Sequence, residues 1–183
     1  ILTSSDSTTW TSVNSITHTY DNGTTDNISS NDVTYGNGTF VVVSPNGFIL
    51  TSTDVTSSWT KRTSGTTNDL NGITYGNSTF MTVGDDGTIL SSSNGTSWST
   101  RTSGTSNGLS GVTYGNSKFV AIGYSGTIVA SSDGTSWDNV TTTADNGTTI
   151  NYTTNNLNGV TYGNSKFVTV GDSGTILTSS NGT

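Results

Sequence analysis

The sequence lacks cysteine, glutamate and glutamine, and it has one proline, one histidine and one methionine. Without cysteine there are no disulfides from which to infer the redox compartment. His18, the only histidine, has no cysteine or carboxylate cluster beside it in the sequence, so we expect no metal site there. A serine–histidine–aspartate triad is unsupported for the same reason, because no nucleophile motif accompanies His18.

Charge is also scarce. Lysine and arginine together number 5 against 12 acidic residues, all of them aspartate, for a net charge of −7. The basic residues are far apart in the sequence, so the chain lacks the electrostatic footprint of a nucleic-acid partner or an anionic membrane. No apolar run approaches the length of roughly 18 residues that a membrane-spanning helix needs, and we expect no membrane insertion.

The residues that are abundant favour turns and strands. The chain has 40 threonines, 30 serines, 23 glycines and 20 asparagines, but only three alanines. This composition predicts an all-β chain with many turns. The hydrophobic content of 28% is low enough to suggest disorder. The apolar residues recur in ordered clusters, however, and that regularity argues against disorder.

The chain is built from internal repeats. The tetrapeptide Thr-Tyr-Gly-Asn occurs four times, beginning at Thr34, Thr74, Thr113 and Thr161. The tryptophans recur at a similar interval, at Trp10, Trp59, Trp98 and Trp137. A period of about 40 residues is the size of a four-stranded propeller blade.

Each repeat divides into four short strands. In the third repeat we expect strands at Val112–Tyr114, Lys118–Ile122 and Thr127–Ser131, and a fourth that starts near Trp137. Because every link is too short for a crossover helix, the strands should form an antiparallel meander. Gly123–Gly126 and Gly171–Gly174 resemble phosphate loops, but no helix follows either, so we interpret them as turns.

Alternation within a strand predicts a blade with two apolar faces. Phe119 and Ala121 should face one way, and Val120 and Ile122 the other. A single blade of this kind cannot bury both faces, so its stability should come from packing against its neighbours. The aromatic residues of each repeat are the expected contacts.

Links between the tryptophan strand and the next repeat are either short or long. The links that follow Trp59 and Trp98 are short and equal in length, whereas those that follow Trp10 and Trp137 are longer and again equal. Both long links contain Asp-Asn-Gly-Thr-Thr, and we expect them to protrude as loops.

The copy numbers of the strands are compatible with more than one mode of assembly. The Ile-Leu-Thr-Ser-Ser strand has five copies, but the other two diagnostic strands have four each. We therefore expect residues 1–183 to form a single propeller repeat domain of about four blades, either a segment of a longer array or a filament subunit. The first strand could overlap the last blade as a clasp, or the chain could be a segment of a longer array. Alternatively, chains could associate head to tail, with the Trp10 strand of one added to the last blade of the next.

The segment Ser131–Trp137 resembles the Asp-box, also called the bacterial neuraminidase repeat, and the complete repeats are similar to photosystem II assembly-factor-like propeller proteins. The resemblance implies a structural role, with the Asp capping a hairpin and the Trp packing in the blade. The implied box residues are Asp6 and Trp10, Asp54 and Trp59, Asn94 and Trp98, and Asp133 and Trp137. Sialidase activity needs an arginine triad and a Tyr/Glu pair, and this chain has two arginines and no glutamate.

Glycosylation and calcium are the remaining site hypotheses. Nine asparagines occupy N-glycosylation sequons: Asn22, Asn27, Asn37, Asn77, Asn94, Asn139, Asn146, Asn151 and Asn181. About eight of the 20 asparagines would do so by chance in a chain this rich in serine and threonine, so the number of sequons is no evidence for glycosylation. Only the position of a sequon favours its occupancy by a sugar, as for the sequons in the long links. The serine and threonine content also suits O-linked sugars. Asp85, Asp86 and Asp172 offer oxygen ligands for calcium, but aspartate and glycine also make hairpin turns, which is the interpretation we favour.

The sequence favours a non-enzymatic, extracellular structural protein, such as a surface coat, stalk, fibril or adhesin, that is glycosylated and needs no cofactor. The second hypothesis is a carbohydrate-binding propeller whose inter-blade pockets use tyrosine and asparagine. A hydrolase is the third, and it would have to rely on aspartate pairs that no motif singles out.

Overall fold

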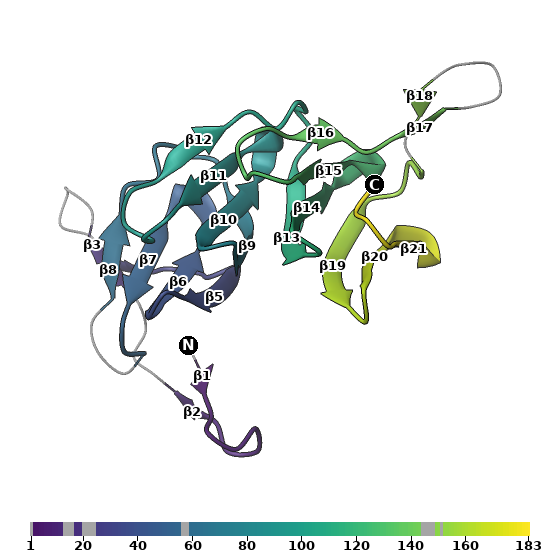
Figure 1. Cartoon of the computed structure of the whole chain (residues 1–183). Coiled ribbons are helices and arrows are strands. Elements are labelled where there is room, and N and C mark those ends of the chain that lie inside the picture. Colours follow the sequence, from purple (N-terminus) through teal and green to yellow (C-terminus); the bar gives the residue numbers. More distant parts are fainter. Residues whose placement is uncertain (1, 13–16, 20–24, 56–58, 144–148, 151) are drawn as a thin grey trace.

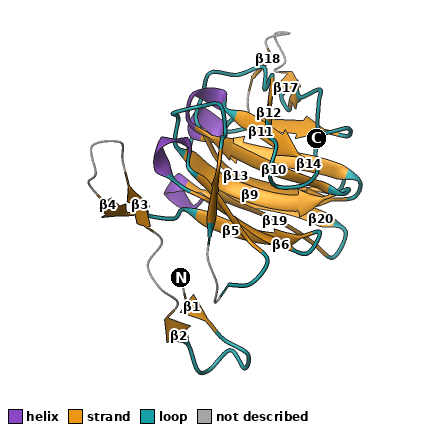
Figure 2. Ribbon diagram, turned by 90° about the vertical axis from the view of Figure 1, so that its left-hand side faces the viewer, coloured by secondary structure: helices purple, strands orange, loops and turns teal. Residues whose placement is uncertain are grey.

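The computed structural model describes residues 2–12, 17–19, 25–55, 59–143, 149–150 and 152–183. These residues form antiparallel sheets joined by short turns, some of them 3-10 helical (Figures 1 and 2). The all-β class and the four-stranded antiparallel sheets expected from the repeat are confirmed. In the part of the chain described, no helix is long and apolar enough to span a bilayer.

Four sheets, which we call blades 1 to 4, follow one another along the chain. Blade 1 consists of β5 (Asp32–Gly36), β6 (Thr39–Val43), β7 (Ile49–Ser52) and β8 (Thr60–Arg62). Blade 2 consists of β9 (Leu70–Gly76), β10 (Thr79–Gly84), β11 (Ile89–Ser92) and β12 (Ser99–Arg101). Blade 3 consists of β13 (Leu109–Gly115), β14 (Lys118–Gly123), β15 (Ile128–Ser131) and β16 (Asp138–Asn139). Blade 4 has three strands, β19 (Leu157–Gly163), β20 (Lys166–Gly171) and β21 (Ile176–Ser179).

In the part of the chain that the structure describes, three two-stranded hairpins lie outside the blades. The first pairs β1 (Leu2–Thr3) with β2 (Thr11–Ser12), which are further copies of a third and a fourth blade strand. The others pair β3 (Thr17–Thr19) with β4 (Thr25–Asn27), and β17 (Thr142–Thr143) with β18 (Thr149–Ile150). Both long links were expected to protrude as loops, and each contains a short pair of antiparallel strands, in keeping with the preference of threonine for strands.

The second and third strands of every blade are joined by one turn of 3-10 helix. These turns are η1 (Pro45–Gly47), η2 (Asp85–Gly87), η3 (Tyr124–Gly126) and η4 (Asp172–Gly174). The turns predicted at Gly123–Gly126 and Gly171–Gly174 are thus confirmed. The predicted strand bounds were less accurate: the first strand of blade 3 is longer than expected, from Leu109 to Gly115.

The core lies between blades rather than within them. Packing of blade 1 on blade 2 buries Val41, Val43, Ile49, Leu70, Ile73, Phe80 and Leu90. Packing of blade 2 on blade 3 buries Met81, Val83, Ile89, Leu109, Val112, Phe119, Ala121, Val129 and Trp137. Packing of blade 3 on blade 4 buries Val120, Ile122, Ala130, Val140, Leu157 and Phe167. Each inner blade therefore contributes to two cores.

Strand β14 shows the two faces directly. Phe119 and Ala121 belong to the core shared with blade 2, and Val120 and Ile122 to the core shared with blade 4, as the alternation predicted. The inner strands β5, β9, β13 and β19 pack side by side in that order. Blades 1 and 4 lie at opposite ends of an open array (Figure 1). Within the described part of the chain, one face of each end blade is therefore left without a neighbouring blade.

Candidate interaction site on the blade faces

In blades 2, 3 and 4, the tyrosine of the inner strand packs on a glycine of the blade before it. A Cβ atom built on any of these glycines would lie only 2.1–2.2 Å from Cγ of the tyrosine ring, so the ring needs a residue without a side chain beneath it. The pairs are Gly36–Tyr75, Gly76–Tyr114 and Gly115–Tyr162. This contact joins blade 1 to 2, blade 2 to 3 and blade 3 to 4.

Within the described residues, each end blade carries one half of this contact without the other. Gly163 is the matching glycine of blade 4, and no described atom lies within 4 Å of a Cβ built there. Tyr35 is the matching tyrosine of blade 1, and it is 57% exposed. We call the glycine on which a tyrosine ring packs a socket. The open socket at Gly163 and the exposed ring of Tyr35 therefore lie at opposite ends of the array.

A second repeated contact stacks aromatic rings over the core. The tyrosine of each blade lies against the phenylalanine of its second strand, with ring centroids 4.5–4.7 Å apart. In blades 2 and 3 a tryptophan is added on the phenylalanine at 6.5 Å, Trp98 over Phe80 and Trp137 over Phe119. Phe167 of blade 4 makes its described ring contact with Tyr162.

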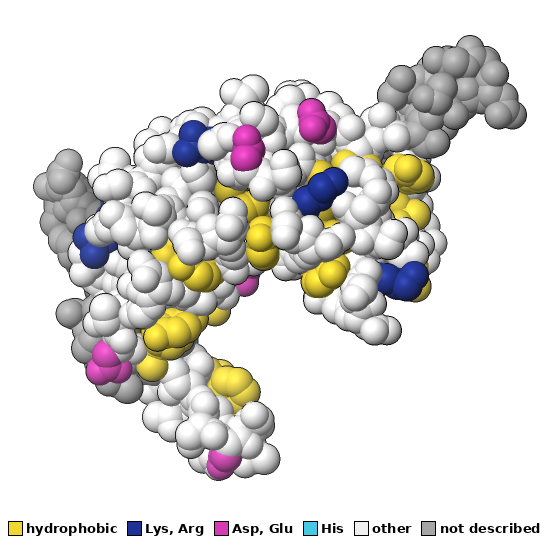
Figure 3. Space-filling view, in the orientation of Figure 1, with side chains coloured by type: hydrophobic (Ala, Val, Ile, Leu, Met, Phe, Trp, Pro, Cys, Tyr) yellow, Lys and Arg dark blue, Asp and Glu magenta, His cyan; other side chains and the backbone are white. Residues whose placement is uncertain are grey.

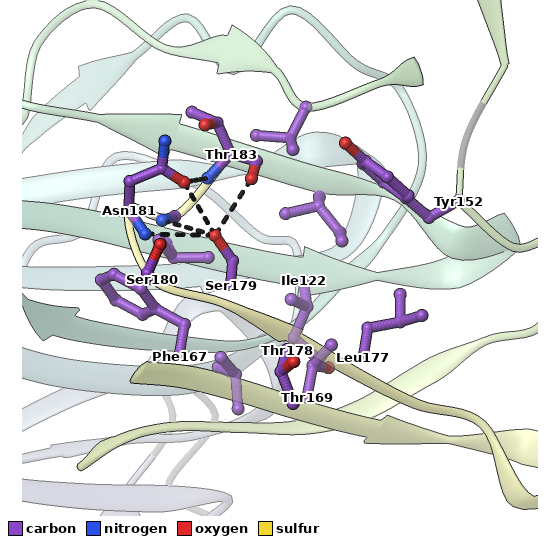
Figure 4. A pocket seen from close by; sticks show the side chains of 15 residues that line it. Ile122, Tyr152, Phe167, Thr169, Leu177, Thr178, Ser179, Ser180, Asn181 and Thr183 are labelled. Carbon is purple, nitrogen blue, oxygen red and sulfur yellow. Dashed lines mark hydrogen bonds between the residues drawn. The ribbon is translucent and has the colours of Figure 1, made fainter. Parts of the chain in front are cut away.

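A groove of about 330 Å³ lies between blades 3 and 4, beside Phe167. Its walls are mainly apolar, with Val120 and Ile122 from blade 3 and Leu177 from blade 4. The hydrogen-bonded turn Ser179–Thr183 lies on one side and Tyr152 on the other (Figure 4). The space-filling view shows apolar side chains in the same region, with charged groups scattered singly over the surface (Figure 3). The groove is therefore suited to an apolar or aromatic side chain.

The backbone beside the groove offers a strand edge. In blades 1 to 3 the third strand pairs on both sides, with the second strand and with the fourth. In blade 4 the described pairing of β21 is with β20 only. A free edge with a groove next to it is the arrangement that accepts an added strand.

Polar side chains also cross from blade to blade. The side-chain amide of Asn31 donates to the carbonyl of Leu70 at 2.9 Å, and Asn71 donates to the carbonyl of Leu109 at 3.0 Å. Ser110 holds the same position in blade 3 and donates to Leu157. Asn158 is the matching residue of blade 4, and it donates to Asp172 within its own blade. We call this side-chain hydrogen bond to a carbonyl of the next blade the polar bridge. It repeats between successive blades up to blade 4.

The residues implied by the Asp-box resemblance form a repeated turn. Oδ1 of Asp133 accepts hydrogen bonds from the backbone N–H groups of Thr135 at 2.7 Å and Ser136 at 2.8 Å, and from the Ser131 hydroxyl at 3.0 Å. Hydrogen bonds from Thr135 and Ser136 hold the pKa of Asp133 well below its ordinary value. Donors from Thr9 and Thr8 likewise lower the pKa of Asp6. Both carboxylates are thus stabilised in their charged form.

The other copies of this turn vary. Asn94 accepts from Thr96 and Ser97 with its amide oxygen, as Asp133 does with its carboxylate. The Asp54 N–H donates to the Ser52 hydroxyl, and residues 56–58 that follow lie outside the described part. Trp137 is 8% exposed and Trp98 half-buried, whereas Trp10 is 58% exposed; Trp59 is half-buried as well.

The sequons fall into two groups. Those with exposed asparagines are Asn37, Asn77, Asn94, Asn139 and Asn181. Asn22, Asn146 and Asn151 lie outside the described residues, as do the side chains of Asn27 and His18.

The candidate calcium ligands do not come together at one place. Asp85 and Asp86 lie in η2 of blade 2, and Asp172 lies in η4 of blade 4. Asn71 donates to Asp85 at 2.9 Å, and Asn158 donates to Asp172 at 2.7 Å. Asp85 and Asp172 thus accept hydrogen bonds from side chains of their own blades.

Sequence analysis missed the glycine socket. Gly115 is the last residue of β13, and its Cα faces the ring of Tyr162. The signal was present, since glycine follows tyrosine in all four copies of the repeat. The polar bridge was not predicted from the sequence either, although Asn71 and Asn158 both lie in the tripeptide Leu-Asn-Gly.

Comparison with solved structures shows the fold. The chain superimposes on YCF48 bound to a D1 peptide with a TM-score of 0.64 at 17% identity, covering 85% of this chain and 51% of YCF48. For the computationally designed Ika4 protein the TM-score is 0.63 at 12% identity, covering 82% of this chain and 90% of Ika4. For the WD40 β-propeller domain of Doa1 it is 0.60 at 16% identity, covering 84% and 52%.

The fold is therefore that of a β-propeller. The chain spans about half the length of YCF48 and of the Doa1 domain. No protein-family model matches the sequence, and no curated protein does.

Proposed function

We propose that this chain is a non-enzymatic structural protein, built from tandem propeller blades and displayed outside the cell as a surface coat, stalk, fibril or adhesin. The observation that carries the proposal is the apolar surface left at the ends of the array. Val33 and Tyr35 of blade 1 are 54% and 57% exposed, and Val170 and Ile176 of blade 4 are 47% and 66% exposed. Such surfaces are suited to contacts with further blades or other proteins.

The proposal that the chain is not an enzyme rests on its composition and on its turns. The chain has no glutamate and one histidine, so general acid–base chemistry would have to come mainly from aspartate. The two aspartates with lowered pKa values, Asp6 and Asp133, hold hairpin turns together by accepting hydrogen bonds from nearby backbone N–H groups. We accordingly assign the eight Asp-box residues a structural role and no cofactor.

A protein partner is supported by two observations. YCF48, which has a similar fold, is found with a bound D1 peptide. In this chain the groove next to β21 combines a strand edge with apolar walls, the two features that an extended segment needs. We propose a strand-like protein segment as the occupant.

Glycosylation is the second part of the proposal. The exposed asparagines Asn37 and Asn77 begin the tight turns after β5 and β9, where a sugar would extend into solvent. Mass spectrometry of native material, before and after enzymatic release of N-linked sugars, measures the occupancy of each sequon. Native protein at its peptide mass would remove this part of the proposal.

Carbohydrate binding remains the alternative, and one observation favours it. Tyr124 and Tyr152 are about half exposed, and Tyr152 lines the groove together with Asn181. Tyr75, Tyr114 and Tyr162 are already engaged by the glycine sockets. Reproducible binding on a glycan array that is lost in Tyr152→Ala would favour this alternative.

Immunogold electron microscopy of native cells tests the main proposal. We expect label on the cell surface, in a coat, stalk or fibril. Label confined to the cell interior, with discrete monomers in the extract, would contradict it.

A further inference from the structure

We propose that a second copy of this chain docks head to tail on blade 4, with its Tyr35 on Gly163 and its Trp10 in the groove. This inference rests on the proposed structural function and names the partner that the end faces accept. It follows from contacts that the chain already makes between its own blades.

The tyrosine contact gives the docking geometry. Three successive blade pairs use the same ring-on-glycine contact, and a Cβ built on the fourth glycine, Gly163, has no described atom within 4 Å. Tyr35 is 57% exposed, and its ring already lies 4.5 Å from Phe40, the arrangement of Tyr75 with Phe80 in blade 2. The ring is thus held in the orientation that the socket requires.

The apolar positions around the socket agree with this docking. In blade 4, Val170 and Ile176 pair across β20 and β21 and are 47% and 66% exposed. The matching pair in blade 2, Val83 with Ile89, is fully buried by blade 3. Docking a further blade would bury the exposed pair in the same way.

The groove accepts the second side chain. Trp98 and Trp137 lie 6.5 Å from Phe80 and Phe119, and each helps to close the core with the preceding blade. Phe167 occupies the same register, and the groove lies beside it. Trp10 is 58% exposed on the β1–β2 hairpin, and the Trp10 side chain of a second copy can fill the groove.

The spacing along the chain allows both contacts at once. Trp10 precedes Tyr35 by the same number of positions as Trp137 precedes Tyr162. Within the chain, that spacing places Trp137 in the core of blades 2 and 3 and Tyr162 on Gly115. A link of equal length can therefore place Trp10 in the groove while Tyr35 lies on Gly163.

Docking exchanges one short strand pairing for another. β2 pairs with β1, and Leu2 lies opposite Ser12. β11 and β12 pair in the same register in blade 2, where Leu90 lies opposite Thr100. Leu177 is the matching residue of β21, so β2 can leave β1 and pair with β21 of the other copy, opposite Leu177.

This contact is heterologous, because the two copies use different faces. Such contacts close into a ring when the rotation permits and otherwise extend into a filament. Charge does not oppose the contact, since the residues that line the groove are apolar, aromatic or neutral polar and none of them is charged.

Two substitutions test the contact from its two sides. Tyr35→Ala removes the ring, and Gly163→Val fills the socket, where the added side chain has open space in the single chain. Tyr124→Ala is the control, because Tyr124 is also exposed but lies in the η3 turn. Analytical ultracentrifugation over a hundredfold concentration range measures the mass, and thermal unfolding checks that each variant is folded.

We expect the natural chain and Tyr124→Ala to associate, and each of the other two variants to raise the dissociation constant by more than about tenfold. A mixture of Tyr35→Ala and Gly163→Val should form a complex of one copy of each, since each retains the half that the other has lost. A natural chain that remains monomeric, association that survives both substitutions, or a mixture that forms no complex would overturn the inference. None of these results depends on where the protein lies in the cell, which tests the proposed function separately.

Discussion

Tyr162 lies so close over Gly115 that a Cβ atom on the glycine would be 2.1 Å from Cγ of the ring, whereas Gly163, one blade further on, faces open space. The same residue type in the same register thus has two different environments. Substitutions at these two glycines therefore distinguish the stability of a blade itself from the stability that it gains by packing against the next blade.

Gly115→Val and Gly163→Val should therefore differ in stability. The first forces Tyr162 away from blade 3 and should lower the free energy of unfolding by about 1–3 kcal/mol or more. The second should change it by less than about 0.5 kcal/mol, as for an unconstrained surface position. Urea denaturation at a concentration where the chain is monomeric measures both. Equal losses would mean that the tyrosine socket does not stabilise the array.

The polar bridge allows a similar comparison. Asn71→Ala removes the hydrogen bond to Asp85 within its own blade and the one to Leu109 of the next blade, and loss of the second should cost about 1 kcal/mol. Asn158→Ala removes a contact to exposed Asp172 within one blade and should cost less than about 0.5 kcal/mol. The unfolding free energies of the two variants decide the matter. A larger loss for Asn158→Ala would contradict the assignment of Asn71 as the bridge between blades.

The groove predicts that two equivalent phenylalanines contribute differently to the stability of the fold. Phe80 is fully buried between blades 1 and 2, and Phe80→Ala should cost about 3–5 kcal/mol. Phe167 lies beside the groove, so Phe167→Ala removes fewer packing contacts and should cost less. Thermal unfolding of the two variants, compared at equal and low concentration, measures the order. Loss of equal size would indicate that the Phe167 site is as tightly packed as the Phe80 site.

Acid should weaken the turn at Asp133. The pKa of this carboxyl is lower in the folded chain than its ordinary value of about 3.9, so its contribution to stability is present above that value. The contribution is lost as the pH falls through the lower folded value, because the unfolded chain binds the proton first. Asp133→Asn keeps an acceptor, as Asn94 does, and should flatten the acid branch of the stability curve below about pH 4.

The reciprocal substitution provides the control for that curve. Asn94→Asp places a titrating carboxyl in the same turn of blade 2 and should steepen the acid branch. Thermal midpoints measured from about pH 2 to about pH 7 give both curves. If Asp133→Asn left the acid branch unchanged, the hydrogen bonds from Thr135 and Ser136 would not be the cause of the lowered pKa.

The sequence predicted the blades well because their signals are local and repeated. The alternation in Lys118–Ile122 identified both faces of β14, and the 3-10 turn at Tyr124–Gly126 lies inside the predicted turn. Strand ends were less predictable, since the length of β13 depends on its contact with β9 and β19. Packing against a neighbour extends a strand beyond what its own residues indicate.

The candidate site was only partly predictable. The count of strands pointed to an incomplete blade and to a role for the Trp10 strand, but it did not locate the groove, which forms where Val120 and Ile122 approach Phe167. The socket at Gly163 was not foreseen, because a glycine that faces open space has the same sequence context as Gly115, which does not. Only the placement of the blades separates the two.

Packing between blades, rather than pairing within them, stabilises the array. Hydrogen–deuterium exchange on the Gly163→Val variant at low concentration tests this claim most directly, because that variant removes the proposed contact between copies. We predict the slowest exchange in β10 and β14, which lie between two neighbouring blades, and faster exchange in β20, which has one. Equal protection of all three strands, or the slowest exchange in β20, would contradict the claim.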